Sequence, residues 1–250
     1  DALGIPRQGT LRLVREGGNL VTSVPRTAIM GASAFIKIAD GCDAGCAFCA
    51  IPLIKGPQVS KPLPDILREA RELAAQGVKE YVLIAQDSTA YGRDLGQQEG
   101  LSALLLDLAS VVPQDAWIRI LYAYPQHISD RLIETMASVP QVCHYLDLPL
   151  QHGHPDVLRR MRRPHDVLMI VDRIQGLRAA MPDIALRTTF LVGFPGESES
   201  EFDALLAMLE QIAFDHVGVF AFSREQGTLA AEMPGQVPAA VGRRRQRQLM

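Results

Sequence analysis

Residues 34–49 read AFIKIADGCDAGCAFC, a stretch that joins an apolar segment to a group of cysteines. Ala34–Ala39 reads as a first β-strand. Directly after it come Cys42, Cys46 and Cys49, at spacings of four and three residues. Thiolates at such close spacing suit a soft metal centre. The stretch therefore predicts a strand that leads into a metal-binding loop.

The number of cysteines in this loop limits the kind of metal centre. A structural zinc site normally takes four ligands, usually as two separated pairs, and no fourth ligand lies nearby in the sequence. Electron-transfer clusters are ordinarily ligated by four cysteines. Three cysteines on a cubane leave one iron open, which favours a catalytic [4Fe–4S] cluster. The alternatives are zinc completed by a distant histidine and three unliganded thiols. Cys143 is expected to be a buried apolar thiol.

Strands alternate with helices through the rest of the chain, which implies a parallel sheet with crossover connections. Six strands in about 190 residues suggest an open partial barrel or a doubly wound sheet, and both place chemistry at the carboxyl ends of the strands. The predicted strands are Ala34–Ala39, Tyr81–Ala85, Trp117–Tyr122, Tyr145–Leu150, Ile184–Val192 and Val217–Phe222. The predicted helices are Asp65–Ala75, one over residues 101–108, one capped by Ser129, Pro155–Arg162, Val167–Ala180, and one from a Ser198–Glu201 capping box to Ile212.

The two ends of the chain lack this alternation. Residues 1–30 are rich in Gly, Pro and Arg, and we expect a linker with a short strand at Leu11–Val14. After Ser223 the apolar pattern ends, so residues 31–223 form the predicted core and residues 224–250 a second linker. The arginines near the end are interpreted as a solvated linker or the start of a helix, with an RNA-facing patch as the alternative. The chain opens at Asp1, so we expect a segment of a longer protein.

Composition sets broad limits on function. Hydrophobic residues make up 48% and charged residues 21% of the chain, as in an ordinary globular protein. The net charge of −3 provides no global reason to expect nucleic-acid binding. Crowded cysteines favour metal ligation in a reducing cytosol over a disulfide framework. No signal peptide and no apolar run of roughly 20 residues is found. We expect a cytoplasmic monomer that does not enter a membrane.

The loop that ends in Ala-Phe48-Cys49 resembles the radical S-adenosylmethionine (SAM) superfamily. Of the two α/β folds left open above, the resemblance implies the partial (β/α)6 TIM-like barrel. It also implies that SAM chelates the open iron of the cluster held by Cys42, Cys46 and Cys49. One electron from such a cluster cleaves SAM, and the resulting 5′-deoxyadenosyl radical abstracts hydrogen from an unactivated carbon, while the protein orients the cofactor.

Further motifs are similar to the methylthiotransferases of this superfamily, which insert sulfur and a methyl group at a C–H bond. They are Ile51-Pro-Leu-Ile-Lys-Gly56 with Val59-Ser-Lys-Pro62, Leu148-Pro-Leu-Gln-His-Gly153 with Met161-Arg-Arg-Pro164, and Arg187-Thr-Thr-Phe-Leu-Val-Gly-Phe-Pro-Gly-Glu197. Ala85-Gln-Asp-Ser-Thr-Ala-Tyr-Gly92 and Tyr122-Ala-Tyr-Pro125 resemble the RimO-type branch, which modifies an aspartate of a small-subunit ribosomal protein. A branch that modifies a tRNA adenosine is the alternative, and a non-catalytic iron–sulfur electron carrier is an alternative from another class.

The resemblance also implies parts outside this chain. Such enzymes have an amino-terminal domain with a second [4Fe–4S] cluster and a carboxyl-terminal β-barrel that binds the substrate. They need a reducing electron donor such as flavodoxin or ferredoxin. We therefore expect this segment alone to bind and cleave SAM without completing methylthiolation.

The resemblance assigns SAM contacts to seven positions beyond the catalytic, metal-binding cysteines. Phe48 is expected near the adenine, with simple packing as the alternative. Gln86 and Asp87 are expected at the SAM amino group, because a carboxylate or amide can accept hydrogen bonds from an ammonium group; bracing of their own loop is the alternative. Gln151 is expected at the ribose or carboxylate, and Arg187 at the SAM carboxylate or at acidic neighbours.

Gly193 and Gly196 are the last two of these positions. They flank Phe194-Pro195 between a predicted strand and a capped helix. The motif resembles the turn on the adenine side of the family's site. Glycines let a backbone approach a ligand closely, although a tight turn alone would also explain them.

Overall fold

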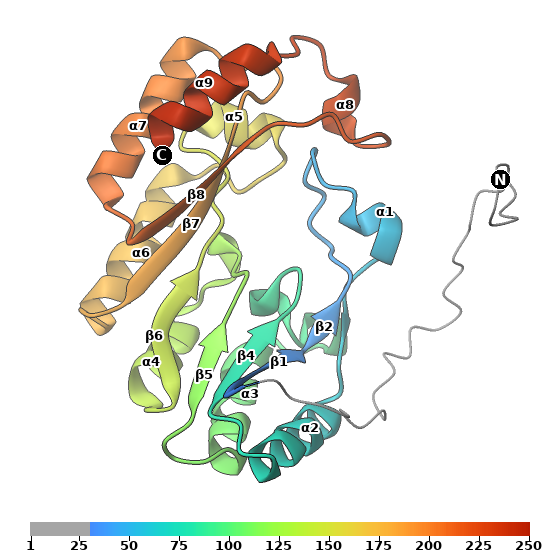
Figure 1. Ribbon diagram of the computed structural model, residues 1–250, viewed down its shortest axis with the longest axis vertical. Coiled ribbons are helices and arrows are strands. Elements are labelled where there is room, and N and C mark those ends of the chain that lie inside the picture. Colours follow the sequence, from blue (N-terminus) through green and yellow to red (C-terminus); the bar gives the residue numbers. More distant parts are fainter. Residues whose placement is uncertain (1–30) are drawn as a thin grey trace, which may run out of the picture.

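The computed structural model describes residues 31–250, and its centre is one parallel β-sheet (Figure 1). Every pairing within this sheet is parallel. The spatial order of the strands is β1-β4-β5-β6-β7-β8. The six strands are β1 Ser33–Lys37, β4 Glu80–Ile84, β5 Trp117–Ile120, β6 Val142–Asp147, β7 Ala185–Val192 and β8 His216–Ala221.

The strand order decides between the two folds that the pattern left open. A doubly wound sheet reverses its strand order at a switch point. Here each of the six strands pairs with the next of the six along the chain, and β1 and β8 lie at opposite edges of the sheet. The sheet is therefore an unclosed arc, which runs from β1 to β8 in Figure 1. The predicted α/β partial barrel is confirmed.

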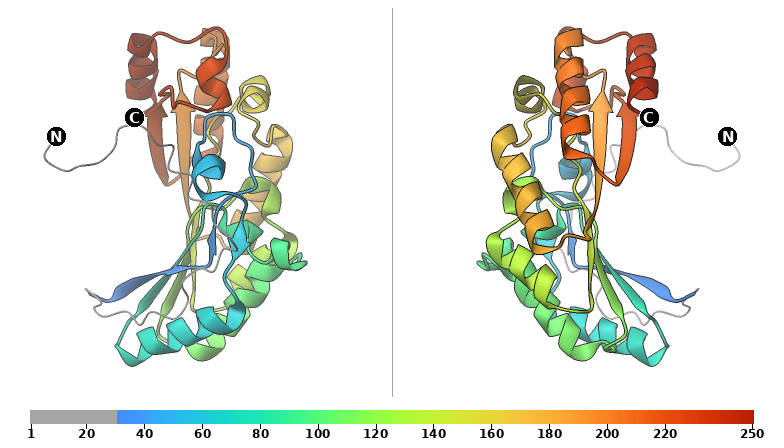
Figure 2. Two further views of the ribbon diagram at one scale, coloured as in Figure 1. Left: turned by 90° about the vertical axis from the view of Figure 1, so that its right-hand side faces the viewer. Right: turned by 90° about the vertical axis from the view of Figure 1, so that its left-hand side faces the viewer.

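Most of the large helices connect the strands and lie along one face of the sheet, whereas the carboxyl-terminal helix stands on the other side of the last two strands (Figure 2). None of the helices within residues 31–250 is long and apolar enough to cross a membrane. Smaller elements line the ends of the strands, including the two-stranded antiparallel pair β2 Ala39–Asp40 and β3 Val59–Ser60. The main helices are α2 Leu63–Ala75, α3 Gly100–Val111, α4 Asp130–Ser138, α5 Pro155–Arg160, α6 Val167–Ala180, α7 Glu199–Ile212 and α9 Ala239–Leu249; the short ones are α1 Ile51–Lys55, α8 Leu229–Glu232, η1 Ser88–Ala90, η2 Arg93–Leu95 and η3 Pro125–His127.

The two faces of the sheet differ in burial because side chains alternate along each strand. Along β7, every second residue is fully buried, and Leu186 belongs to the same core as Leu177 of α6 and Leu205 of α7. On the other face Phe35 and Phe220 remain 56% and 59% exposed. The helix-covered face thus forms the core, and the opposite, open face is available to a site.

Most predicted helices are found, with differences at their boundaries. Ser129 caps α4, and Ser198 with Glu201 forms a capping box on α7, as predicted. The predicted helix Asp65–Ala75 begins two residues earlier, at Leu63, so Asp65 lies in the first turn of α2. The predicted strand Ala34–Ala39 is divided into β1 and β2, since Ala39 pairs with Ser60 of β3 instead of continuing in the main sheet.

Residues 224–250 differ from the expected linker. They contain α8 and α9, and α9 packs against β8 and β7. Arg245 of α9 is 3% exposed, and Leu249 belongs to the main core. The expected solvated arginine run is therefore partly buried. The expectations for residues 1–30 lie outside the described residues.

Candidate active site

The loop Cys42–Cys49 lies at the carboxyl end of the first strand and is fixed by the backbone on both sides. Gly41 has φ of +79°, and a Cβ there would lie 2.1 Å from the carbonyl oxygen of Pro57. Only glycine fits this position. Farther along, the Ala47 N–H donates to the Met161 carbonyl at 2.9 Å. The loop is thus held between the segment after α1 and the end of α5.

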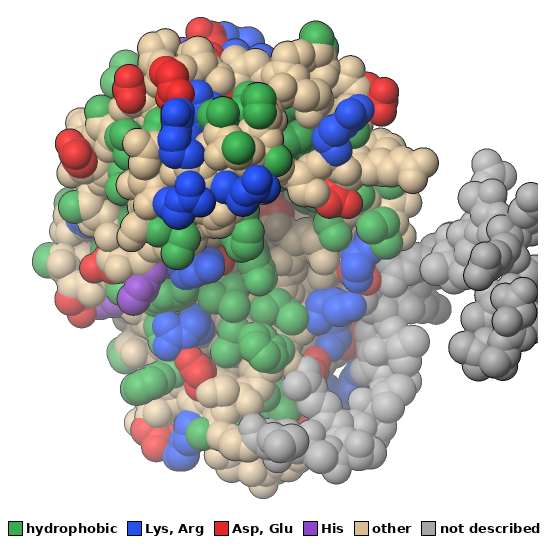
Figure 3. Space-filling view, turned by 45° about the horizontal axis from the view of Figure 1, so that its top comes forward, with side chains coloured by type: hydrophobic (Ala, Val, Ile, Leu, Met, Phe, Trp, Pro, Cys, Tyr) green, Lys and Arg blue, Asp and Glu red, His purple; other side chains and the backbone are tan. Residues whose placement is uncertain are grey.

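The three cysteines of the loop line one cavity of about 540 Å³ on the open face of the sheet. Its walls come from the loop and from the ends of successive strands, as expected for a site in a parallel barrel. Figure 3 shows a hollow with hydrophobic side chains in it and Lys and Arg side chains around it. Of the predicted site residues, the cavity brings together Cys42, Cys46, Cys49, Phe48, Gln86, Gln151 and Arg187.

The thiols fit an iron–sulfur cluster by their environment. All three are half-buried and free of disulfides. Burial raises the pKa of Cys42; the Ala44 N–H opposes this, and Asp87, Cys46 and Cys49 raise the pKa further. Neighbouring thiolates repel one another, so a cation is needed for all three to be ionised together. A bound metal supplies this charge and deprotonates the thiols that coordinate it. Among residues 31–250, no three potential ligands lie close enough together to bind one metal ion. A cubane cluster does not require this, because each cysteine ligand binds a different iron.

The polar residues of the cavity differ in their backbone conformation and in how much of their hydrogen-bonding capacity is already used. Gln86 has a buried Oε1 without a hydrogen-bond partner among the described residues. Such an acceptor is costly to bury unless a donor reaches it. Gln151 has φ of +74°, an uncommon conformation for a residue with a side chain. Arg187 donates to Asp147 at 2.6 Å, so its acidic neighbour already takes part of its hydrogen-bonding capacity.

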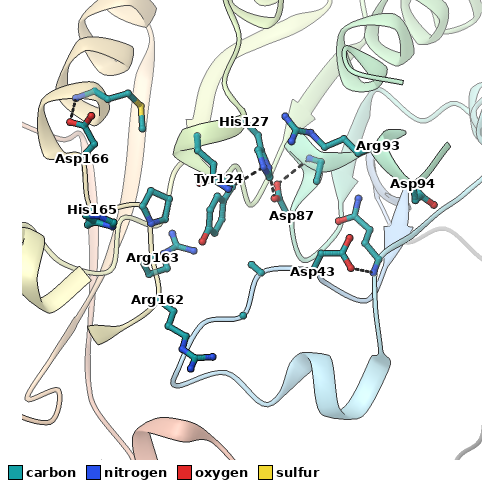
Figure 4. Close-up of a pocket in the computed structure, with 17 residues that line it drawn as sticks. Asp43, Asp87, Arg93, Asp94, Tyr124, His127, Arg162, Arg163, His165 and Asp166 are labelled. Atoms are coloured by element: carbon teal, nitrogen blue, oxygen red, sulfur yellow. Dashed lines mark hydrogen bonds and ion pairs between the residues drawn. The ribbon is translucent and has the colours of Figure 1, made fainter. Parts of the chain in front are cut away.

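Asp87 lies outside the cavity of the thiols. It lines a neighbouring cavity of about 650 Å³, where Figure 4 shows it beside His127. Its carboxylate accepts from the Thr89 hydroxyl at 2.5 Å and the Ala90 N–H at 3.2 Å, and it lies 2.8 Å from His127 Nδ1. These contacts correspond to the alternative interpretation, in which Asp87 braces its own loop.

Gly193 and Gly196 do not line the cavity of the thiols, and their expected approach to a ligand stays a prediction. Both have positive φ, +74° and +76°. A Cβ on Gly193 would lie 3.0 Å from the Gly242 Cα of α9, and the Gly196 N–H donates to the Gly235 carbonyl at 2.8 Å. The close approach that requires glycine is therefore to the carboxyl-terminal segment of this chain.

Gly193→Ala is expected to lower the free energy of unfolding by about 2–4 kcal/mol. The left-handed backbone contributes roughly 1–2 kcal/mol, and the crowding against α9 contributes the rest. Gly77→Ala is the matched control, since Gly77 has φ of +84° and nothing within 4 Å of its added Cβ. Urea unfolding measures both variants. Equal losses would mean that the contact with α9 contributes nothing.

Three cavity residues of particular interest were not singled out from the sequence, namely Tyr122, Tyr124 and Arg163. Tyr122 has φ of +61° and a side chain that is 46% exposed. Strained backbone of this kind is concentrated at functional sites. These residues do lie within motifs that resemble the family, residues 122–125 and 161–164, and this was the only sequence signal for them.

Comparison with known proteins agrees with this geometry. The family model of the radical SAM superfamily matches residues 36–209. The ribosomal protein uS12 methylthiotransferase RimO of Roseiflexus sp. (strain RS-1) is 57% identical over 229 residues, which are 92% of this chain and 48% of the relative. The protein of that name from Chloroflexus aurantiacus is 58% identical over 218 residues, 87% of this chain and 48% of the relative. The chain thus spans about half the length of these curated relatives.

A solved structure supports the fold independently. The radical SAM methyltransferase TsrM from Kitasatospora setae, with cobalamin and a [4Fe–4S] cluster bound, superposes with a TM-score of 0.67. The match covers 80% of this chain and 38% of that protein, at 15% sequence identity. At this identity the likeness shows the shared barrel alone.

Proposed function

This chain belongs to the radical SAM superfamily, and we propose that it is the catalytic core of a methylthiotransferase that modifies an aspartate of ribosomal protein uS12. The observation that carries the proposal is the convergence of three half-buried thiols on one cavity at the carboxyl ends of the strands. The relatives that are 57% and 58% identical over 229 and 218 residues support the choice of reaction and substrate.

In this proposal Cys42, Cys46 and Cys49 hold a [4Fe–4S] cluster. When bound, the cluster and SAM supply a primary carbon radical, which removes hydrogen from an unactivated C–H bond. The chain must hold SAM in one orientation and keep water away. Phe48 and Phe220 contribute apolar walls to the cavity. Phe48 also packs edge-on against Phe194, with the ring centroids 6.5 Å apart, so its ring is held in place.

The proposed SAM contacts follow from the free hydrogen-bonding capacity in the cavity. The unpartnered Oε1 of Gln86 can accept from the amino group of the methionine part. Gln151 and Arg187 can donate to its carboxylate or to the ribose, and Phe48 can stack beside the adenine. Asp87 braces its own loop through three contacts, and the remaining acceptor site on Oδ2 can still accept from the SAM amino group.

The remaining components are proposed to come from outside the described residues. A second cluster would belong to an amino-terminal domain that residues 1–30 connect, and a β-barrel would follow α9. The electron donor would be a reduced flavodoxin or ferredoxin. We propose that the protein is cytoplasmic, in agreement with a ribosomal protein as substrate, and that it is a monomer.

The test uses the full-length protein that contains this chain. After anaerobic reconstitution with iron, sulfide and dithionite, it is incubated with SAM and either purified uS12 or bulk tRNA. Mass spectrometry should find a methylthio group in place of hydrogen on an aspartate of uS12. Modification of a tRNA adenosine with unchanged uS12 would contradict the proposed substrate.

A further inference from the structure

The loop after α5 brings a buried arginine against one of the three thiols. Arg163 is 8% exposed, and its Nη1 lies 3.8 Å from the Cys46 Sγ. Its Nη2 donates to the Pro149 carbonyl. The guanidinium carbon lies 4.1 Å from the centre of the Tyr124 ring, in a cation–π contact. Figure 4 shows the Arg163 side chain beside Tyr124, in the wall between the two cavities.

The positive charge of Arg163 lacks an acidic partner. Within residues 31–250, its guanidinium contacts are a sulfur, a carbonyl oxygen and an aromatic ring, and none is a carboxylate. Its buried Nε has no hydrogen-bond partner among these residues. A guanidinium stays charged in proteins, and a buried charge is costly unless an opposite charge compensates it. Of these three contacts, only the Cys46 sulfur can carry a compensating negative charge, as the thiolate of a cluster ligand.

We propose that Arg163 is a positioning residue that acts through Cys46 and raises the reduction potential of the cluster. The inference rests on the proposed function, because it requires Cys46 to be a ligand of the cluster. Reduction adds one negative charge to the cluster, and a fixed positive charge beside a ligand sulfur stabilises the more negative state. N–H groups directed at ligand sulfurs change cluster potentials in the same direction.

The neighbouring residue Arg162 provides a matched control for this charge. It occupies the same loop but is exposed. The two arginines carry the same charge at similar positions, but solvent screens only Arg162 effectively. A general effect of net charge on the cluster would therefore appear in both variants, and a local effect only at Arg163.

The experiment measures the potential of the reconstituted cluster without substrate or SAM. Wild type, Arg163→Gln, Arg163→Lys and Arg162→Gln are titrated with dithionite, and the reduced cluster is followed by electron paramagnetic resonance. Arg163→Gln is expected to disfavour the one-electron reduction at least tenfold, a shift of about 59 mV to lower potential. Arg162→Gln is expected to change this equilibrium less than about threefold, which is under half that shift.

The lysine variant separates charge from packing. Arg163→Lys retains the charge, so a potential close to that of wild type, together with a lowered potential in Arg163→Gln, supports the inference. If Arg163→Gln holds no cluster, Arg163→Met takes its place as the neutral variant. A shift in Arg163→Lys as large as in Arg163→Gln overturns it, as does an unchanged potential in Arg163→Gln. A wild-type chain that assembles no cluster would instead remove the proposed function, and the inference with it.

Discussion

Cys46→Ala is expected to leave the reconstituted chain without a stable [4Fe–4S] cluster. The bound iron should fall from roughly four per chain to less than about one, because two thiolates cannot hold a cubane that ordinarily uses three or four. Production of 5′-deoxyadenosine from SAM should fall to background. Iron analysis, the visible absorption of the cluster and chromatography of the products measure these effects.

Cys143→Ala is the control for this substitution. Cys143 is also a free and half-buried thiol, but it lies on β6 and does not line the cavity of the other three. Burial raises its pKa, and Arg119 opposes this. The variant should keep the full complement of iron and form 5′-deoxyadenosine as wild type does. Loss of the cluster in Cys143→Ala would mean that the ligands have been assigned wrongly.

Arg245→Met is expected to lower the free energy of unfolding by about 3–5 kcal/mol, because it leaves the buried Glu197 carboxylate without its cation. Arg245 Nη1 lies 3.3 Å from Glu197 Oε1 and donates to the Glu197 carbonyl at 3.1 Å. Both side chains are almost completely buried, at 3% and 0% exposure. For a chain of this size the loss corresponds to a decrease in Tm of roughly 10 °C. Thermal unfolding followed by circular dichroism measures it.

Two further variants identify the cause of that loss. Arg244→Met removes an arginine that is 50% exposed and pairs with Glu199 at the surface, so it should cost less than about 1 kcal/mol. Glu197→Gln combined with Arg245→Met removes both charges and should recover much of the stability. If Arg245→Met were no more destabilising than Arg244→Met, α9 would not be part of the folded core.

Local sequence patterns were sufficient for much of the fold. Continuous apolar runs such as Tyr81–Ala85 place most strands in the sheet within a residue or two, whereas the predicted strand Tyr145–Leu150 is displaced by three residues from β6. The capping residues Ser129 and Ser198 mark helix starts correctly, because a cap is formed by residues that are neighbours in the sequence. The cysteine loop could be recognised for the same reason.

Apart from shifted element boundaries, the errors concern contacts between distant segments. Helix α9 has little apolar periodicity. Much of its packing comes from the close approach of Gly242 to Gly193 and from the ion pair between Arg245 and Glu197. The close approach of α9 to Gly193 was consequently not foreseen from the sequence. Arg163 and Cys46 are 117 residues apart in the sequence. No periodic pattern reports such a pair, and only the folded chain brings them together.

The most direct test of the radical SAM core is the cleavage of SAM by this chain. The reconstituted and reduced protein is incubated with SAM, and 5′-deoxyadenosine is quantified while electron paramagnetic resonance records the cluster before and after SAM is added. We expect product formation and a changed cluster signal, since SAM would bind the open iron. A brown, reduced protein whose signal SAM leaves unchanged and which forms no product would contradict the assignment.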